Sequence, residues 1–248
     1  MKYLIIGASS GLGRELANKF AEEKNDLILV SRDMRDLSAM KSDLEIKYGI
    51  YVDCISTDFT STEKIENDLF SKEVLIKNIK GVLFPLGLMY DQDNVNLNTE
   101  NMKRLIYSNY LSIAFCIQKL NKYLAQHKDS TIIGFGSVSG LLGRKINSIY
   151  AGAKRGLESY FESLAFDEKF KNINIQFYIL GYLDTNLSFG KDLKLPRGSI
   201  KKLSHIVYKN KSVNFKKIIF PYYWRIISFI LKVTPFSIIK KIGTIFKK

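Results

Sequence analysis

Residues 2–20 read KYLIIGASSGLGRELANKF: an apolar strand at 2–6, a glycine-rich turn, and a segment with helical periodicity. A glycine-rich turn between a strand and a helix N-terminus lets backbone amides approach a pyrophosphate. The glycines follow a Gly-x-x-x-Gly-x-Gly spacing, not the commoner Gly-x-Gly-x-x-Gly, but strand, glycines and helix fall in the required order. We therefore predict a nucleotide site built by Gly7, Ser9, Ser10, Gly11, Leu12 and Gly13.

The remaining chain alternates short apolar strands with helical segments. Strands are predicted at 26–30, 50–56, 81–84, 131–136, 173–179 and 216–220, and helices at 34–48, 62–78, 99–127, 148–170 and 203–210. Such alternation is typical of an α/β fold with a doubly wound parallel sheet. We expect residues 1–221 to form one dinucleotide-binding catalytic domain.

The ends of the second and third predicted strands bear on the cofactor. In dinucleotide folds an acid at the end of the second strand binds the ribose hydroxyls, whereas an arginine there accommodates a 2′-phosphate. Arg32 therefore favours NADPH, although Asp33 is a competing signal for NADH. Asp58 could contact the adenine or cap the helix that starts near Thr62.

A second motif begins where the fifth predicted strand ends. Ser137 follows that strand, and Tyr150 and Lys154 lie one helical turn apart in the next helix. Side chains at i and i+4 share one helix face. A nearby ammonium should lower the tyrosine pKa, which makes Tyr150 a candidate general acid or base. Ser137 could hydrogen-bond the substrate oxygen.

Composition excludes several classes of protein. Two cysteines and two histidines, far apart in the sequence, predict neither a disulfide framework nor a metal site, and fit a reducing compartment. The chain enters a strand at residue 2, so we expect no signal peptide.

Together these residues resemble the short-chain dehydrogenase/reductase family over residues 2 to about 185, and more loosely to about 221. Ser137, Tyr150 and Lys154 reproduce its Ser-x₁₂-Tyr-x₃-Lys pattern. The resemblance implies a Rossmann-type fold, with Asn109 as a fourth catalytic residue that helps relay the proton through water. It also implies cofactor contacts from Gly87, Tyr150, Lys154, Gly181 and Thr185, with Thr185 on the nicotinamide carboxamide, and a substrate loop at 186–202.

The sequence departs from the family pattern at three places. Phe84-Pro85-Leu86-Gly87 stands where the family has Asn-Asn-Ala-Gly, Leu180 replaces a proline, and Ile6 replaces a threonine. None of these changes removes a catalytic group. In the implied mechanism the nicotinamide transfers hydride, Tyr150 passes the proton, and Lys154 holds the nicotinamide ribose.

Residues 222–248 form a tail of a different character. The chain carries a net charge of +14. Residues 193–248 hold fourteen Lys or Arg and no acid, so they account for the whole excess of positive charge. Tyr222 to Val233 is apolar except for a polar stripe of Arg225, Ser228 and Lys232, and a second helix is predicted at 236–246 beyond Pro235. Each piece is too short to span a bilayer. We expect an amphipathic tail on an anionic membrane surface, with Trp224, Phe229, Ile230 and Phe236 inserted at the headgroups. Packing on the domain or on a second subunit of a homo-oligomer is the alternative.

These features lead to one principal hypothesis and two alternatives. The principal hypothesis is a cytoplasmic NADPH-dependent carbonyl reductase, peripheral on the inner face of a membrane, acting on a small-molecule or lipid-linked carbonyl such as a lipid, a polyprenyl-linked sugar or a glycan precursor. A non-catalytic NAD(P)-sensing protein with this fold is one alternative. A nucleic-acid binder is the other, but the apolar stripes of the tail fit lipid better, so we expect no nucleic-acid partner.

Overall fold

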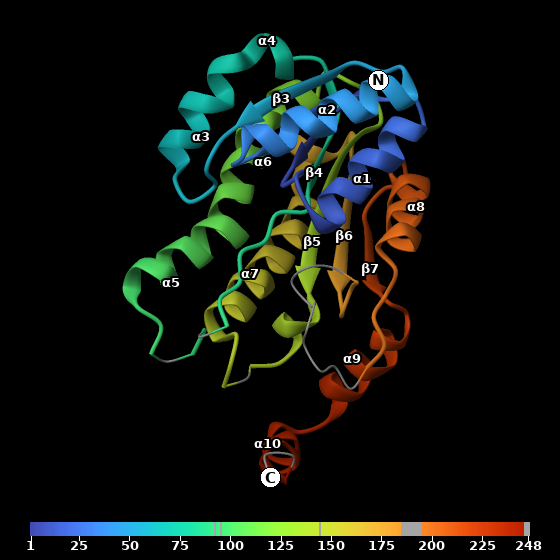
Figure 1. The fold of residues 1–248 in the computed structure, drawn as a ribbon. Helices are drawn as coiled ribbons and strands as arrows, with labels where there is room; N and C mark the ends of the chain where they lie inside the picture. Colours follow the sequence, from blue (N-terminus) through green and yellow to red (C-terminus); the bar gives the residue numbers. More distant parts are fainter. Residues whose placement is uncertain (92, 95, 144, 185–194, 246–248) are drawn as a thin grey trace.

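The computed structural model describes residues 1–91, 93–94, 96–143, 145–184 and 195–245. Its centre is a seven-stranded parallel sheet with the order β3-β2-β1-β4-β5-β6-β7 (Figure 1). The strands are β1 (Lys2–Ile6), β2 (Asp26–Ser31), β3 (Val52–Ser56), β4 (Ile79–Phe84), β5 (Ser130–Ser137), β6 (Ile173–Leu180) and β7 (Lys216–Phe220). The predicted doubly wound sheet is confirmed.

Helices cover both faces of the sheet (Figure 1). On one face lie α1 (Gly11–Glu22), α2 (Met34–Tyr48) and α8 (Ile200–Asn210). On the other lie α3 (Thr62–Asp68), α4 (Glu73–Ile76), α6 (Ser112–Leu124) and α7 (Ser148–Leu164), with α5 (Thr99–Ile106) leading into α6. The strands read as apolar runs because both of their faces are buried.

Close packing of α7 on the sheet positions the second motif. A Cβ added at Gly134 would lie 2.3 Å from Cζ of Phe161, so only glycine lets this helix approach β5 so closely. The register pairs Ser137 with Leu180 at the carboxyl ends of β5 and β6. Ser137, the start of α7 and Gly181 therefore meet at one edge of the sheet.

Three predicted helices are shorter or interrupted in the structure. The segment 62–78 contains α3, a 3₁₀ turn at Phe70–Lys72 and α4. The segment 99–127 is broken by a π turn at Tyr107–Leu111, which turns Ser108 and Asn109 into the interior. The segment 148–170 ends as an α-helix at Leu164.

The tail forms α9 (Tyr223–Val233) and α10 (Phe236–Ile245). Phe229, Ile230 and Phe236 are exposed, as the predicted lipid-facing surface requires, but two other residues of α9 differ from the prediction. Trp224 and Ser228 are buried, and the Trp224 ring contacts Tyr182 at 5.6 Å between centroids. Trp224 is therefore not free to enter a lipid surface, and Ser228 does not belong to an exposed polar stripe. The indole packs on Gly181 because burying that large apolar ring outweighs the amphipathic pattern of the tail alone.

No helix in the described part of the chain is long and apolar enough to cross a bilayer.

Candidate active site

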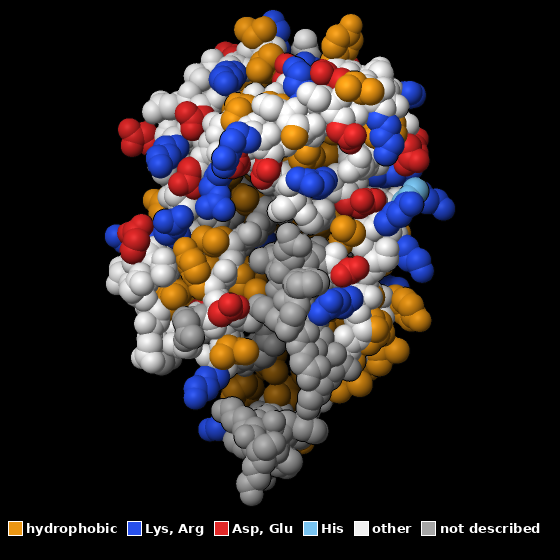
Figure 2. Space-filling model, viewed as in Figure 1, with side chains coloured by type: hydrophobic (Ala, Val, Ile, Leu, Met, Phe, Trp, Pro, Cys, Tyr) orange, Lys and Arg blue, Asp and Glu red, His pale blue; other side chains and the backbone are white. Residues whose placement is uncertain are grey.

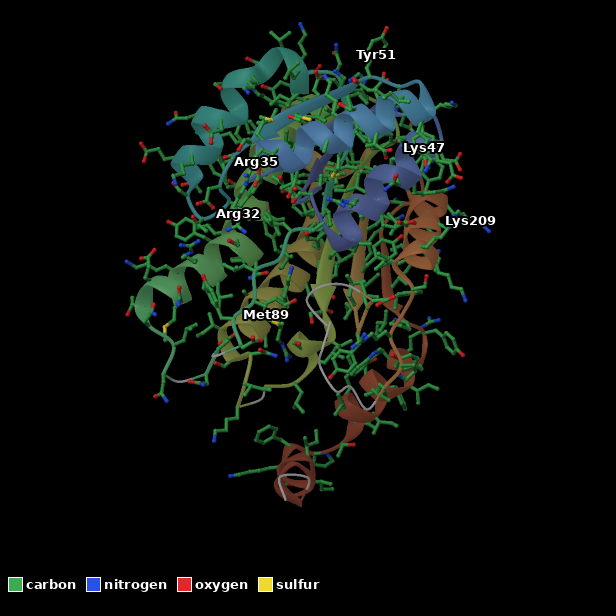
Figure 3. All side chains as sticks on the ribbon, viewed as in Figure 1. Arg32, Arg35, Lys47, Tyr51, Met89 and Lys209 are labelled. Atoms are coloured by element: carbon green, nitrogen blue, oxygen red, sulfur yellow. The ribbon has the colours of Figure 1, made fainter. Side chains whose placement is uncertain are left out.

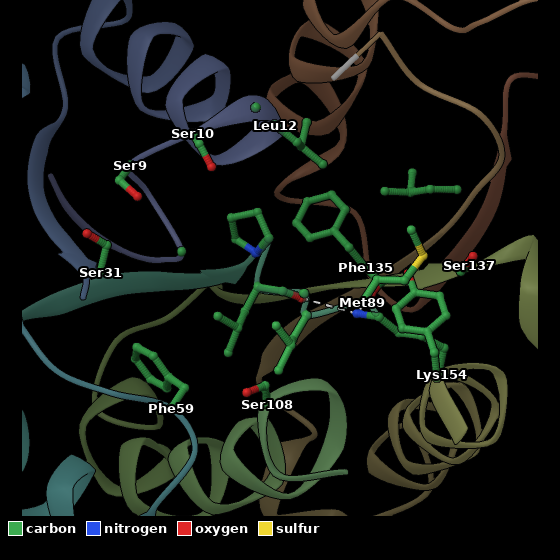
Figure 4. A pocket seen from close by; sticks show the side chains of 18 of the residues that line it. Ser9, Ser10, Leu12, Ser31, Phe59, Met89, Ser108, Phe135, Ser137 and Lys154 are labelled. Carbon is green, nitrogen blue, oxygen red and sulfur yellow. Dashed lines mark hydrogen bonds between the residues drawn. The ribbon is translucent and has the colours of Figure 1, made fainter. Parts of the chain in front are cut away.

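A cleft of about 1170 Å³ opens at the carboxyl ends of the strands, and most of the predicted site residues line it (Figure 4). From the prediction, the cleft is lined by Gly7, Ser9, Ser10, Gly11, Leu12, Arg32, Asp58, Gly87, Ser137, Tyr150, Lys154 and Gly181. Thr185 and most of the predicted substrate loop lie outside the described residues. Open α/β sheets bind their ligands at this edge.

The glycine turn presents a helix N-terminus to the cleft. Gly7 has φ +97°, and its amide donates to the Val30 carbonyl at 2.8 Å. Ser10 precedes α1 without a side-chain cap bond, and the first turn of α1 holds no acid. The backbone amides in the first turn of α1 are therefore free to donate hydrogen bonds to an anionic ligand. Gly13 is buried, and a Cβ at this position would lie 1.9 Å from the Gly7 carbonyl oxygen. Only glycine therefore lets α1 pack this closely against the turn.

Tyr150 and Ser137 form the polar centre of the cleft. Both side chains line the cleft, and the Ser137 Oγ accepts from the Ser139 amide at 3.1 Å. Burial raises the pKa of Tyr150, and the neighbouring Ser137 hydroxyl opposes that rise only in part. The expected lowering of this pKa by Lys154 is therefore wrong for this arrangement, because burial destabilises the phenolate more than its neighbours stabilise it. At neutral pH the phenol keeps its proton.

Lys154 is held by backbone carbonyls and not by Tyr150. Its Nζ donates to the carbonyls of Phe135 at 3.0 Å and Leu86 at 3.1 Å (Figure 4), and it lies 5.9 Å from the Tyr150 ring centroid. The side chain is only 4% exposed, and burial lowers its pKa to about 7. The sequence analysis did not predict these two contacts. Leu86 lies in the segment 84–87, which departs from the family pattern, so its carbonyl was not recognised as a partner of Lys154.

Asn109 is fully buried in the π turn beside this centre. Its Nδ2 donates to the carbonyls of Leu88 at 2.7 Å and Leu105 at 3.0 Å, and its Oδ1 accepts from the Leu88 amide at 3.2 Å. A Cβ at Gly87 would lie 3.6 Å from that Oδ1 and 4.0 Å from the Lys154 Nζ. Asn109 thus fixes the loop that lies between itself and Lys154.

The far end of the cleft carries the two competing cofactor signals. Asp33 caps α2 by accepting from the Arg35 amide, and it also accepts from Arg35 Nε at 3.1 Å and Nη2 at 2.7 Å. Because of that guanidinium, the pKa of Asp33 falls to about 2. The Asp33 carboxylate is paired with Arg35, and Arg32 and Asp33 both line the cleft (Arg32 and Arg35 are labelled in Figure 3).

Asp58 does not cap the following helix, since Ser61 takes that position. Its carboxylate instead accepts from the amide and hydroxyl of Thr60 at 3.1 and 2.8 Å, at the cleft wall.

The sequence analysis missed several apolar residues that line the same cleft as Ser137 and Tyr150. Its lining includes Met89, Ile146, Tyr182 and Leu183. These residues lie in connections between helices and strands, which have no regular periodicity. Large apolar side chains in such connections were the only sequence sign that they could line a cleft.

Comparison with known proteins agrees with this geometry. The model of the short chain dehydrogenase family matches residues 2–194. The chain belongs to this family. It is accordingly an oxidoreductase, and the Rossmann-type domain and family resemblance inferred from its motifs are confirmed.

Among curated relatives, the 3-oxoacyl-[acyl-carrier-protein] reductase of Bos taurus is 26% identical over 76% of this chain and 77% of its own length. The very-long-chain 3-oxoacyl-CoA reductase of Vanderwaltozyma polyspora is 28% identical over 74% of this chain. The alignment spans only 55% of that longer relative.

Solved structures share the fold at low sequence identity. A short-chain dehydrogenase from Sphingobium yanoikuyae in complex with NADPH superposes with a TM-score of 0.78 at 23% identity, over 89% of this chain and 88% of the other. A 7beta-hydroxysteroid dehydrogenase gives a TM-score of 0.84 at 16% identity, over 98% and 96% of the two chains.

Proposed function

We propose that this short-chain dehydrogenase reduces a ketone on a long-chain, lipid-type substrate with NADPH. The observation that carries the proposal is a single cleft that gathers Tyr150, whose pKa burial raises, with Ser137, several apolar side chains and the glycine turn. A phenol that keeps its proton at neutral pH is the state that donates to a carbonyl oxygen. The relatives named as 3-oxoacyl reductases support this substrate class.

The lining of the cleft offers groups for each part of the cofactor. The amides of Ser10, Gly11 and Leu12 would bind the pyrophosphate, Arg32 the 2′-phosphate and Asp58 the adenine. Gly87 and Gly181 would border the nicotinamide half, as Thr185 would. When bound, NADPH supplies the hydride.

The protein's own groups then handle the proton. Ser137 orients the carbonyl oxygen, and Tyr150 donates its phenolic proton to that oxygen as negative charge develops there. Lys154 would hold the nicotinamide ribose and stabilise the phenolate that remains. Reprotonation of Tyr150 would run through water near Asn109, whose side chain holds Leu88 through its carbonyl and its amide.

Steady-state oxidation of NADPH and NADH over a panel of 3-oxoacyl thioesters, keto-sugars and quinones tests this function. We expect NADPH and long-chain thioesters to be preferred. Arg32→Asp should weaken NADPH binding at least about tenfold and leave NADH binding nearly unchanged, since only NADPH carries the 2′-phosphate. Equal affinity of the unmodified protein for both cofactors would rule out the Arg32 assignment, and turnover restricted to keto-sugars would rule out the lipid substrate.

We also infer that residues 222–248 are an appendage to the domain of residues 1–221 and rest on an anionic lipid surface. The exposed face of α9 is apolar at helical spacing, with Ile226 at 64% exposure, Phe229 at 66%, Ile230 at 53% and Val233 at 62% (Figure 2). Arg225 and Lys232 flank it and are exposed. Apolar faces bordered by basic residues, in a tail without acids, fit a membrane interface.

Phe229→Asp should abolish co-sedimentation with vesicles of phosphatidylserine and phosphatidylcholine, because it places a charge in the centre of this face. The matched control is Phe166→Asp, which alters a side chain of 89% exposure outside the tail and should leave vesicle binding intact. High salt should weaken binding of the unmodified protein. If Phe229→Asp instead dissociates a dimer seen by light scattering, and vesicles are not bound, the face is a subunit interface and the membrane proposal fails.

A further inference from the structure

A buried carboxylate outside the predicted site holds the first turn of α7, the helix that carries Tyr150. Asp93 lies between β4 and α5 and is 0% exposed. Its Oδ2 accepts from the Tyr150 amide at 2.8 Å, and its Oδ1 accepts from the Ile149 amide at 3.0 Å and the Ser148 hydroxyl at 3.3 Å. The Asn147 amide donates to the Asp93 main-chain carbonyl at 2.6 Å.

This arrangement supplies a cap that α7 lacks within its own sequence. Asn147 precedes the helix in the left-handed conformation, at φ 57°, and its side chain makes no cap bond. The first turn of α7 contains no acid. Without Asp93, the amides of Ile149 and Tyr150 would be left without these acceptors, and the positive end of the helix would lose its counter-charge.

Of the site residues, Tyr150 would be displaced most by loss of this cap. It is the third residue of α7, within the turn that frays first. Lys154 lies a turn deeper and is fixed independently by the Phe135 and Leu86 carbonyls. Fraying of the first turn would therefore displace the phenol from Ser137 while the lysine stays in place.

Resting on the proposed function, we propose that Asp93 is a positioning residue: it sets the Tyr150 phenol against Ser137 by capping α7 from a distant loop. Because Asp93 follows the cleft residues Leu86 to Met89 on one connection, it also ties the cofactor-side loop to the catalytic helix. The sequence gives no local sign of this, since cap and helix are 54 residues apart (93 against 147).

The test compares Asp93→Ala and Asp93→Asn with the unmodified protein, well below the unfolding temperature. Asp93→Ala should lower kcat by about 10- to 100-fold, the scale of a small misplacement of a reacting group. NADPH affinity, measured by fluorescence, should stay within about threefold, because the glycine turn is untouched. Asp93→Asn should recover part of kcat, since its amide oxygen still accepts while its NH₂ group faces a donor.

Ser61→Ala is the matched control, because Ser61 caps α3, a helix that contributes nothing to the catalytic centre, through the Lys64 amide at 3.3 Å. It should lower the unfolding temperature without lowering kcat. If Asp93→Ala behaves like Ser61→Ala, Asp93 acts only on stability and the proposal is overturned. Should Asp93→Ala not fold, Asp93→Asn decides: a kcat equal to that of Ser61→Ala overturns the proposal, and one at least about fivefold lower supports it.

A readout independent of turnover separates this proposal from the proposed function. With ¹³C-labelled tyrosine, the Tyr150 ring resonance, assigned by Tyr150→Phe, should shift or broaden in Asp93→Ala and not in Ser61→Ala. If the unmodified protein turns over no substrate, the reductase assignment fails while this shift still reports the cap. An unchanged resonance, whatever the activity, overturns the positioning role.

Discussion

Replacing Tyr150 with Phe should lower kcat by roughly 10²- to 10⁴-fold, the size of a general acid–base contribution. The ring and its packing remain, and only the proton donor is lost. NADPH binding should persist, because the glycine turn and Arg32 lie at the other end of the cleft. Single-turnover oxidation of bound NADPH, followed by absorbance, measures the loss directly.

Tyr182→Phe is the matched control for that variant. It makes the same chemical change at another tyrosine of the same cleft and should leave most of the activity. Retention of more than about a tenth of wild-type kcat by Tyr150→Phe would show that another group donates the proton.

The second large effect concerns Lys154 and pH. Burial sets the pKa of Lys154 at about 7 in the folded protein, whereas an unfolded chain has a lysine pKa near 10.4. Between about pH 7 and 10 the unfolded chain binds a proton there that the folded chain does not, so the free energy of unfolding rises with pH. Relative to Lys154→Met, the unmodified protein should gain up to about 1.4 kcal/mol per pH unit over this range.

Urea unfolding of both proteins without added cofactor, from pH 6 to pH 9, measures this difference. Lys154→Met also removes the ammonium donor from the Phe135 and Leu86 carbonyls, but that cost adds a constant and does not create a slope. Lys202→Met, at an exposed lysine, is the control. A difference that is flat with pH would mean that Lys154 stays protonated in the folded protein.

Residues close in the chain were predicted well. The turn at Gly7 to Gly13 works through a strand, a turn and a helix start that are contiguous, so its geometry follows from local spacing. Tyr150 and Lys154 share a helix face because they are four residues apart, and Ser137 reaches them because parallel strands end at the same edge. These local rules carry the fold class and the central residues of the site.

The errors came from contacts between distant segments. Lys154 was expected to lower the pKa of Tyr150, but burial raises that pKa instead. The Lys154 ammonium is held by the carbonyls of Leu86 and Phe135, which come from another loop and another strand. The sequence left open whether Arg32 indicates NADPH or Asp33 indicates NADH. In the structure the Asp33 carboxylate accepts two hydrogen bonds from the Arg35 guanidinium. Asn109 was expected at the site only from the family resemblance, and the π turn that buries it was not predicted.

The sequence by itself therefore determined the parallel sheet, the glycine turn and the grouping of Ser137, Tyr150 and Lys154 at one cleft, since periodicity and short spacings encode them. Only the tertiary structure decided that the Trp224 side of α9 is buried and which residue caps α7. Trp224 turns inward because its large ring is stabilised by leaving water against Gly181, and Asp93 reaches the Tyr150 amide because the fold brings that loop to a helix end with unpaired donors. Burial and hydrogen-bond satisfaction are properties of the packed chain, and no local pattern specifies them.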